Sequence, residues 1–219
     1  QILLGELPDG SWLVDKTPGY ANDMSTLEAG KAYDPLYIWL VRHPLGVVDS
    51  KVRLLRRQSK YKGLGGVFRR SQDAWQTRMR GMSDKARRRE SKWTRQNENI
   101  RQFLKTLPQT SWVKLHFEDL LLKPEDSVKR LCSFLDVDFV PDMTSPFKER
   151  IKMKPGLGNP NFHTRSKIET GPVFAWLDRY EESLLEQQTL DLLLEIGIPR
   201  EDRLRLLAQK QADNQPDKS

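Results

Sequence analysis

An apolar run from Leu36 to Val41 is the feature that most constrains the fold of this chain. Such a run is typical of a buried strand in a parallel sheet. It ends in Arg42-His43-Pro44, and Pro44 fits the first turn of a helix that we expect to continue to Arg57. A strand, a turn and a helix in this order predict an α/β fold with a ligand site at the carboxyl end of the strand.

The rest of the chain predicts strands that alternate with helices. Further strands are expected at Trp12–Val14 and Ser111–Phe117, and further helices at 24–33, 71–107, 124–135, 183–195 and 200–211. This alternation predicts a parallel sheet with helices on both faces. We expect one domain over residues 1–208 and a polar linker or tail over 209–219, and we expect both ends to be cuts from a longer polypeptide.

Charge and cysteine content narrow the class of protein. The 219 residues carry a net charge of +7, which suits an anionic ligand or an acidic partner without choosing between them. Cys132 is the single cysteine, so an internal disulfide is excluded, and it reads as a small core residue. The first residues lack the pattern of a signal peptide, and Leu36–Val41 is far too short to span a bilayer. We therefore expect a cytoplasmic protein with no membrane partner.

Arg42 and Ser50 are candidates for binding a phosphate. Arginine presents a planar fork of donors that matches a phosphate, and a serine eight residues later adds a hydroxyl from the same side. The alternative is a surface arginine followed by an ordinary helix serine. The strand before them and Pro44 after the turn favour the phosphate site.

Lys16 is a second candidate, in the segment Asp15-Lys16-Thr17-Pro18 after the first predicted strand. Ligands of α/β sheets bind at the carboxyl ends of strands. A lysine there is a compact charge that suits a transferring phosphoryl or sulfuryl group. The alternative is a lysine on a solvated loop.

A third candidate is the loop from Lys154 to His163. Its glycines, Gly156 and Gly158, allow backbone amides to approach an anion closely, and His163 suits a general base near neutral pH. The alternative for His163 is a structural or exposed histidine. No cluster of metal ligands is visible in the sequence.

Three other polar positions have structural interpretations. His43 would shape the turn after the strand, and His116 would pack within its strand. Glu118-Asp119 would start the next element or orient a neighbour.

A basic stretch runs from Arg78 to Arg95. Its ordinary meaning is a solvated helix face, and its functional alternative is a docking surface for an acidic protein. Nucleic acid is not favoured, because the nearby aromatic residues fit core positions rather than a stacking platform.

The segments around these candidates resemble those of sulfotransferases that use 3′-phosphoadenosine 5′-phosphosulfate (PAPS). Arg42 to Ser50 is similar to the family's 3′-phosphate motif, and Asp15 to Pro18 to its lysine segment. Phe117-Glu118-Asp119-Leu120 resembles the recurring Tyr-Glu-Asp-Leu segment, with Phe in place of Tyr. Gly156 to Pro160 resembles the loop that closes over the 3′-phosphate.

A narrower resemblance is to sulfotransferase domains within modular polyketide and olefin synthases. It rests on Trp93, Asn97, Asn99, Ile100, Phe103, the segment Gly158 to Thr164, Ile168 and Trp176. In those domains a histidine of the late loop is the catalytic base, which implies His163 here. Cytosolic sulfotransferases instead place the base just after the lysine, a place that Pro18 holds in this chain.

The resemblance implies a P-loop nucleotide-binding type of fold and transfer of a sulfuryl group from PAPS to a hydroxyl. The acceptor would be a β-hydroxyacyl chain on an acyl carrier protein that docks on Arg78 to Arg95. No metal is implied. His163 and Lys16 would be catalytic, and the cofactor would be bound by Arg42, Ser50, Lys154, Gly156, Leu157 and Gly158.

The family's segment for the 5′-phosphosulfate lies before the position of Trp12 and has no counterpart here, so we expect an N-terminally incomplete domain. Two alternatives stay open. One is a free-standing sulfotransferase for a carbohydrate or small alcohol, and the other is a non-catalytic binding module.

Overall fold

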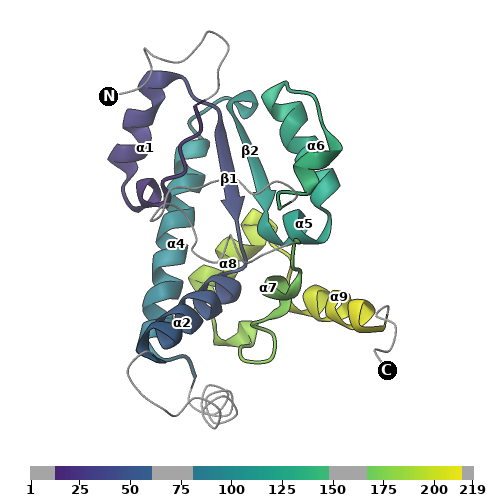
Figure 1. The fold of residues 1–219 in the computed structure, drawn as a ribbon. Helices are drawn as coiled ribbons and strands as arrows, with labels where there is room; N and C mark the ends of the chain where they lie inside the picture. The colour runs from purple at the N-terminus through teal and green to yellow at the C-terminus, as the bar shows by residue number, and fades with distance from the viewer. Residues whose placement is uncertain (1–12, 61–80, 148–166, 214–219) are drawn as a thin grey trace.

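A two-stranded parallel sheet lies at the centre of the computed structural model, which describes residues 13–60, 81–147 and 167–213 (Figure 1). Strand β1 (Tyr37–Val41) pairs with β2 (Trp112–His116) in continuous register, from Tyr37 opposite Trp112 to Val41 opposite His116. Both strands lie within one residue of the predicted bounds. Strand β1 formed from an apolar run that ends before Arg42-His43-Pro44, and in β2 the buried Val113 and Leu115 alternate with less buried residues.

Helices surround this sheet. The α-helices of the described residues are α1 (Met24–Gly30), α2 (Pro44–Lys60), α4 (Asp84–Leu104), α5 (Phe117–Leu122), α6 (Pro124–Leu135), α7 (Gly171–Phe174), α8 (Gln187–Ile196) and α9 (Glu201–Asp213). Short 3-10 turns are η1 (Pro18–Asn22), η2 (Lys31–Tyr33), η3 (Gln109–Ser111), η4 (Pro141–Thr144) and η6 (Glu182–Leu184). Helix α6 has the predicted bounds, because Pro124 fits its first turn and Asp136 ends it in a left-handed conformation.

The two faces of the sheet are covered by different helices. On one face the buried Trp39 donates its indole N–H to Asn97 of α4, and Lys114 donates to the carbonyl of Ile196 in α8. On the other face Val113 and Leu115 of β2 are buried near α6, whereas Leu40 of β1 is 51% exposed. The predicted parallel sheet flanked by helices is confirmed.

The helix predicted from Ser71 to Leu107 is shorter in the described part of the chain. It begins at Asp84, where the Ser83 hydroxyl accepts a hydrogen bond from the amide of Ala86. Gly81 precedes it with a φ of 77°, a conformation that a helix cannot continue through. Residues 71–80 of the predicted helix lie outside the described residues.

The strand predicted at Trp12–Val14 is not present in its described part. Leu13 and Val14 are irregular and exposed, Val14 at 82%, because the described sheet gives them no neighbouring strand to pair with. Trp12 lies outside the described residues.

The C-terminal helices start slightly later than predicted. Residues 182–184 form the turn η6, so α8 begins at Gln187 rather than at Ser183, and α9 begins at Glu201. Cys132, predicted to be a small core residue, is buried, and so are the aromatic residues Trp93 and Phe103 of α4. None of the described helices has the length and apolarity to cross a membrane, and the described residues hold no group of three or more His, Cys, Asp or Glu side chains placed to bind a metal.

Candidate functional site

Arg42 lies directly after β1, and three elements hold it in place. Its Nη2 donates to the carbonyl of Pro172 at 2.6 Å, and its guanidinium lies 4.3 Å from the ring centroid of Phe117. Its own carbonyl accepts a hydrogen bond from the indole of Trp93 at 3.0 Å. These contacts fix both the backbone and the side chain of the arginine before any ligand binds.

The carbonyl of Pro172 accepts from one of the five N–H donors of the Arg42 guanidinium, so other donors have no described partner. The Nε of Arg42 is buried without a hydrogen-bond partner among the described residues. Burial lowers the pKa of Arg42, while the nearby charges of Glu118 and Asp49 oppose that shift. A bound anion would offset the cost of burying this cation and would use its remaining donors.

Gly46 and Ser50 continue from Arg42 along one face of α2. A Cβ atom at Gly46 would lie only 3.0 Å from Arg42 Nε, so the absence of a side chain allows the guanidinium to lie against the helix. Ser50 comes one turn later on the same face, half-buried and without a hydrogen bond to any described residue. Arg42, Gly46 and Ser50 therefore form a face on which Arg42 Nε and the Ser50 hydroxyl have no partner among the described residues, and we name it the Arg42 face.

His43 is enclosed and cannot reach a ligand. Its Nδ1 accepts from the amide of Leu45, its Nε2 lies 2.9 Å from Glu182, and its ring stacks on Trp176 at 4.2 Å. Because Nδ1 accepts, Nε2 carries the proton and donates to Glu182. Burial lowers the pKa of His43, although the bond to Glu182 opposes the shift. The predicted role in shaping the turn is confirmed, with the added link to Glu182.

Glu118 orients the same turn. Its Oε1 accepts from the amide of His43 at 2.9 Å, which confirms the predicted role in orienting a neighbour. Its other oxygen has no partner among the described residues, and burial raises the pKa of its carboxyl. The turn therefore has a buried carboxylate on one side and the Phe117 ring against Arg42 on the other.

A buried carboxylate next to Ser50 fastens α2 to the C-terminal segment. Asp49, 2% exposed, lies 2.8 Å from Arg53 and 2.6 Å from Arg179. Gly46, Pro172, Arg179 and Glu182 were not predicted from the sequence. Only Gly46 had a local signal, since a glycine in the first turn of a helix is unusual.

Lys16 lies on an exposed loop and makes no ion pair with any described residue. The loop is ordered by Asp15, whose carboxylate accepts from the hydroxyls of Thr17 and Tyr20 at 2.7 Å each. These hydrogen bonds, that from Tyr20 first, lower the pKa of Asp15.

Helix α4 connects this loop to the Arg42 face. Gln96 donates to the carbonyl of Pro18, and Trp93, one turn earlier, donates to the carbonyl of Arg42. Asn99 donates to the carbonyl of Ala21. Three side chains of one helix thus hold the lysine loop and the arginine turn beside the same stretch of α4.

The remaining predicted site residues are His163, Lys154, Gly156, Leu157 and Gly158. They lie outside the described residues. Their proposed roles stay predictions from the sequence.

The chain is similar in sequence and in fold to known sulfotransferases. Residues 3–142 match a model described as the sulfotransferase family. A solved sulfotransferase domain from the curacin biosynthetic pathway is 29% identical, with a TM-score of 0.68 over 88% of this chain and 64% of that domain. No curated protein matches significantly.

A second solved structure is similar in fold. The sulfotransferase domain from the olefin synthase of Synechococcus PCC 7002 is 24% identical, with a TM-score of 0.67 over 87% of this chain and 60% of that domain. The chain therefore spans less than two thirds of the length of either domain.

Proposed function

The chain belongs to the sulfotransferase family, and we propose that the domain it forms transfers a sulfuryl group from PAPS to a hydroxyl group. The observation that carries this proposal is the Arg42 face. Arg42, held by Pro172 and Phe117, has a buried Nε without a partner among the described residues, and Ser50 on the same face carries a hydroxyl that bonds to no described residue. This combination suits a phosphate group better than it suits a neutral ligand.

The Arg42 face would bind the 3′-phosphate of the donor. The Nε of Arg42 and the hydroxyl of Ser50 supply donors, and Gly46 leaves room beside the guanidinium. Lys154 and the backbone amides of Gly156, Leu157 and Gly158 would complete this pocket, as the family resemblance implies.

The chain's own residues would divide the work of the reaction. PAPS supplies a sulfuryl group whose bond to the phosphate oxygen breaks as the acceptor oxygen bonds to sulfur. Lys16 would balance the negative charge that grows on the phosphate oxygen. His163 would take the proton of the acceptor hydroxyl. The enclosed His43 is unsuited to that role, because Glu182 and Leu45 occupy both of its ring nitrogens.

The acceptor we propose is a β-hydroxyacyl chain on an acyl carrier protein. Support comes from the likeness to the curacin-pathway domain. It also comes from the resemblance of Asn97 and Asn99 on α4 to residues of synthase domains; Asn97 accepts from Trp39 of β1, and Asn99 donates to Ala21 of η1. Sulfation would convert the β-hydroxyl into a leaving group for a later elimination.

The test is a transfer assay with the full protein that carries this chain. Incubation with PAPS and a β-hydroxyacyl carrier protein should give a sulfated carrier protein, detected by intact-protein mass spectrometry, and an equal amount of adenosine 3′,5′-bisphosphate. Equal rates with the free acyl thioester would favour a free-standing sulfotransferase. Absence of both products, with no binding of the bisphosphate, would contradict sulfuryl transfer and favour a non-catalytic module.

A further inference from the structure

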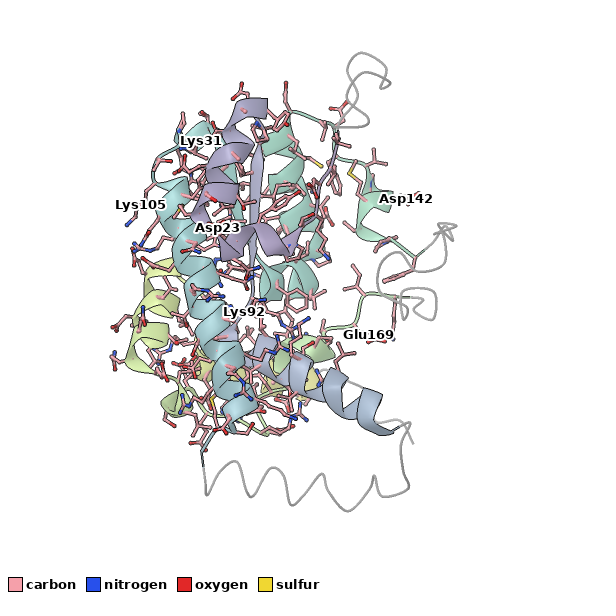
Figure 2. The ribbon with its side chains drawn as sticks, turned by 90° about the vertical axis from the view of Figure 1, so that its left-hand side faces the viewer. Asp23, Lys31, Lys92, Lys105, Asp142 and Glu169 are labelled. Carbon is pink, nitrogen blue, oxygen red and sulfur yellow. The ribbon has the colours of Figure 1, made fainter. Side chains whose placement is uncertain are left out.

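A row of positive side chains follows the outer face of α4. It consists of Lys85, Arg88, Arg89, Lys92 and Arg95, and we name it the cationic stripe. The spacings of three and four residues place all five on one side of the helix, over a length of about 15 Å. Figure 2 looks onto this helix and labels Lys92 midway along it.

The stripe is not neutralised within the described part of the chain. None of its five side chains forms an ion pair with a described residue, whereas Arg87 and Arg101 of the same helix pair with Glu90 and Glu98. Glu90 is the one acidic residue between positions 85 and 95, and it is fully buried, where it accepts from Arg87 and from the amide of Glu186. Unpaired cations in a row repel one another, so a stripe of this kind is stabilised by an external anionic surface.

The exposure of the aromatic and apolar side chains of α4 indicates which kind of anionic partner fits the stripe. Its aromatic residues Trp93 and Phe103 are 5% and 1% exposed, so they cannot stack on bases. The exposed large apolar side chains of the described residues lie outside α4, so the helix lacks an anchor for a membrane. A folded acidic protein, with carboxylates spaced along a helix, fits a straight cationic row of this length.

One end of the stripe lies next to the loop that carries Lys16. Gln96 follows Arg95 on the same side of α4 and holds the loop of Lys16 through the carbonyl of Pro18 and the side chain of Asn22. A protein docked along the stripe would therefore lie beside the lysine that we place next to the transferring group.

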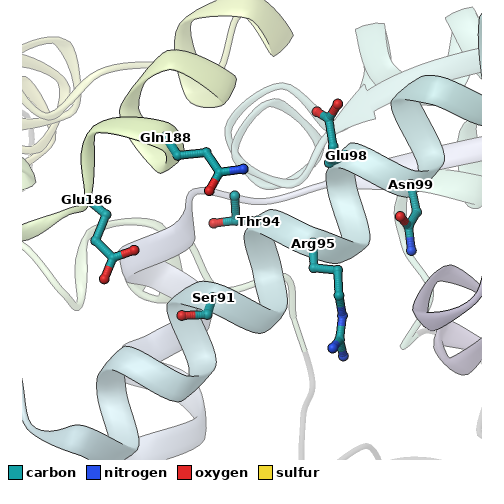
Figure 3. Close-up of a pocket in the computed structure, with 7 residues that line it drawn as sticks. All are labelled: Ser91, Thr94, Arg95, Glu98, Asn99, Glu186 and Gln188. Carbon is teal, nitrogen blue, oxygen red and sulfur yellow. The ribbon is translucent and has the colours of Figure 1, made fainter.

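A hollow of about 220 Å³ marks the other edge of the stripe, between α4 and the start of α8 (Figure 3). Figure 3 shows Arg95 and Glu98 leaving α4 in different directions, with Glu186 across the hollow. Glu186 forms no ion pair with a described residue and would repel a negative partner, so the docked surface is confined to the stripe.

We propose that the cationic stripe of α4 is the docking surface for the acidic carrier protein that delivers the acceptor hydroxyl. The inference rests on the proposed function, since it takes the carrier protein as the source of the acceptor. The stripe provides attraction and alignment, and the adjoining Lys16 loop receives the tethered acceptor. Charges at the rim of an interface mainly govern the association rate and its salt dependence.

The test measures binding without turnover. A fluorescently labelled acyl carrier protein from a modular polyketide synthase is titrated with the full chain, and anisotropy is followed at low and at moderate salt. The double variant R88E/K92E should bind about tenfold more weakly or worse. The matched control K123E/K210E changes the net charge equally at exposed positions at the start of α6 and on α9, and it should stay within about twofold of the wild-type affinity.

Other outcomes would overturn the inference. They are an equal loss in both double variants, an affinity that does not depend on salt, or wild-type binding of duplex DNA or phosphatidylserine vesicles as tight as that of the carrier protein. Both variants should also bind adenosine 3′,5′-bisphosphate like the wild type. A wild-type chain that binds the bisphosphate but not the carrier protein would count against the stripe alone, whereas absent bisphosphate binding in the wild type would count against the proposed function.

Discussion

Arg42 lies against Gly46, at a position where a single added methyl group would come within 3.0 Å of the guanidinium Nε. This contact allows the guanidinium to lie against the first turn of α2, and Ser50 comes one turn later on the face that carries Gly46. The glycine is thus part of the candidate anion site, although its own backbone is helical and does not require glycine.

Replacing Gly46 by alanine should therefore weaken ligand binding. Alanine is the better helix former by about 1 kcal/mol, so stability should rise or stay level. The affinity for adenosine 3′,5′-bisphosphate should fall by about three- to tenfold, because the guanidinium must shift by a few tenths of an ångström. Calorimetric titration measures this change. Gly30→Ala is the control, since its new methyl group would meet only ordinary contact with Tyr37.

The ring of Phe117 should contribute to the same affinity. It lies 4.3 Å from the Arg42 guanidinium, and a cation–π contact of this kind contributes about 0.5–1 kcal/mol at exposed sites. Phe117→Leu should thus weaken bisphosphate binding by about two- to fivefold, whereas Phe117→Tyr, which keeps the ring, should bind like the wild type. If the leucine and tyrosine variants lose affinity equally, the ring is not what positions Arg42.

The buried His43 should make stability depend on pH. Its pKa is lowered from 6.5 by burial, against the attraction of Glu182 and Glu201 and together with repulsion from Arg200. The unfolded chain therefore binds more protons than the folded chain below about pH 6.5, and the free energy of unfolding falls as pH falls. One such proton gives a slope of at most about 1.4 kcal/mol per pH unit.

Urea unfolding followed by tryptophan fluorescence between about pH 5 and 8 measures this slope. His43→Gln should flatten the acid side of the curve. His116→Gln should flatten it less, because burial also lowers the pKa of His116 but that residue is only half-buried. An unchanged slope in His43→Gln would show that other groups cause the acid loss.

His163 should be needed for turnover and not for nucleotide binding. In the complete domain His163→Ala should lower kcat by about 10²- to 10⁴-fold, the usual contribution of a general base, while the bisphosphate affinity stays near the wild-type value. Single-turnover transfer and calorimetry give the two quantities. Near-normal turnover in this variant would remove His163 as the base.

The local parts of the fold were predictable from the sequence. The run Leu36–Val41 contains β1, because a short apolar run that ends before a helix-starting proline favours a buried strand. The segment Pro124 to Leu135 forms α6, because a proline in the first turn and a helical apolar period favour a helix. The helix α7 was missed, because four residues are too few for a periodic pattern. The strand predicted at Trp12–Val14 is absent at Leu13 and Val14, because a run of apolar residues forms a strand only where a partner strand is available for pairing.

In the candidate site, too, the residues close together in the sequence were predictable, whereas their partners far along the chain were not. Arg42 and Ser50 could be named from their spacing around a strand and a turn. The groups that hold Arg42 could not, because Pro172 lies 130 residues away and reaches it only through the packing of α7. Glu182 likewise meets His43 across 139 residues. Such partners are fixed by tertiary packing, which the spacing of residues in the chain does not encode.

The most direct test of the central claim is the calorimetric affinity of Arg42→Lys for adenosine 3′,5′-bisphosphate. Lysine keeps the charge and removes the planar fork, so the affinity should fall by about tenfold or more, and Ser50→Ala should fall less and in the same direction. The thermal unfolding of both variants is measured beside the wild type, so that a folding defect is recognised. A folded Arg42→Lys variant that binds the bisphosphate with unchanged affinity would contradict the assignment of the 3′-phosphate to the Arg42 face.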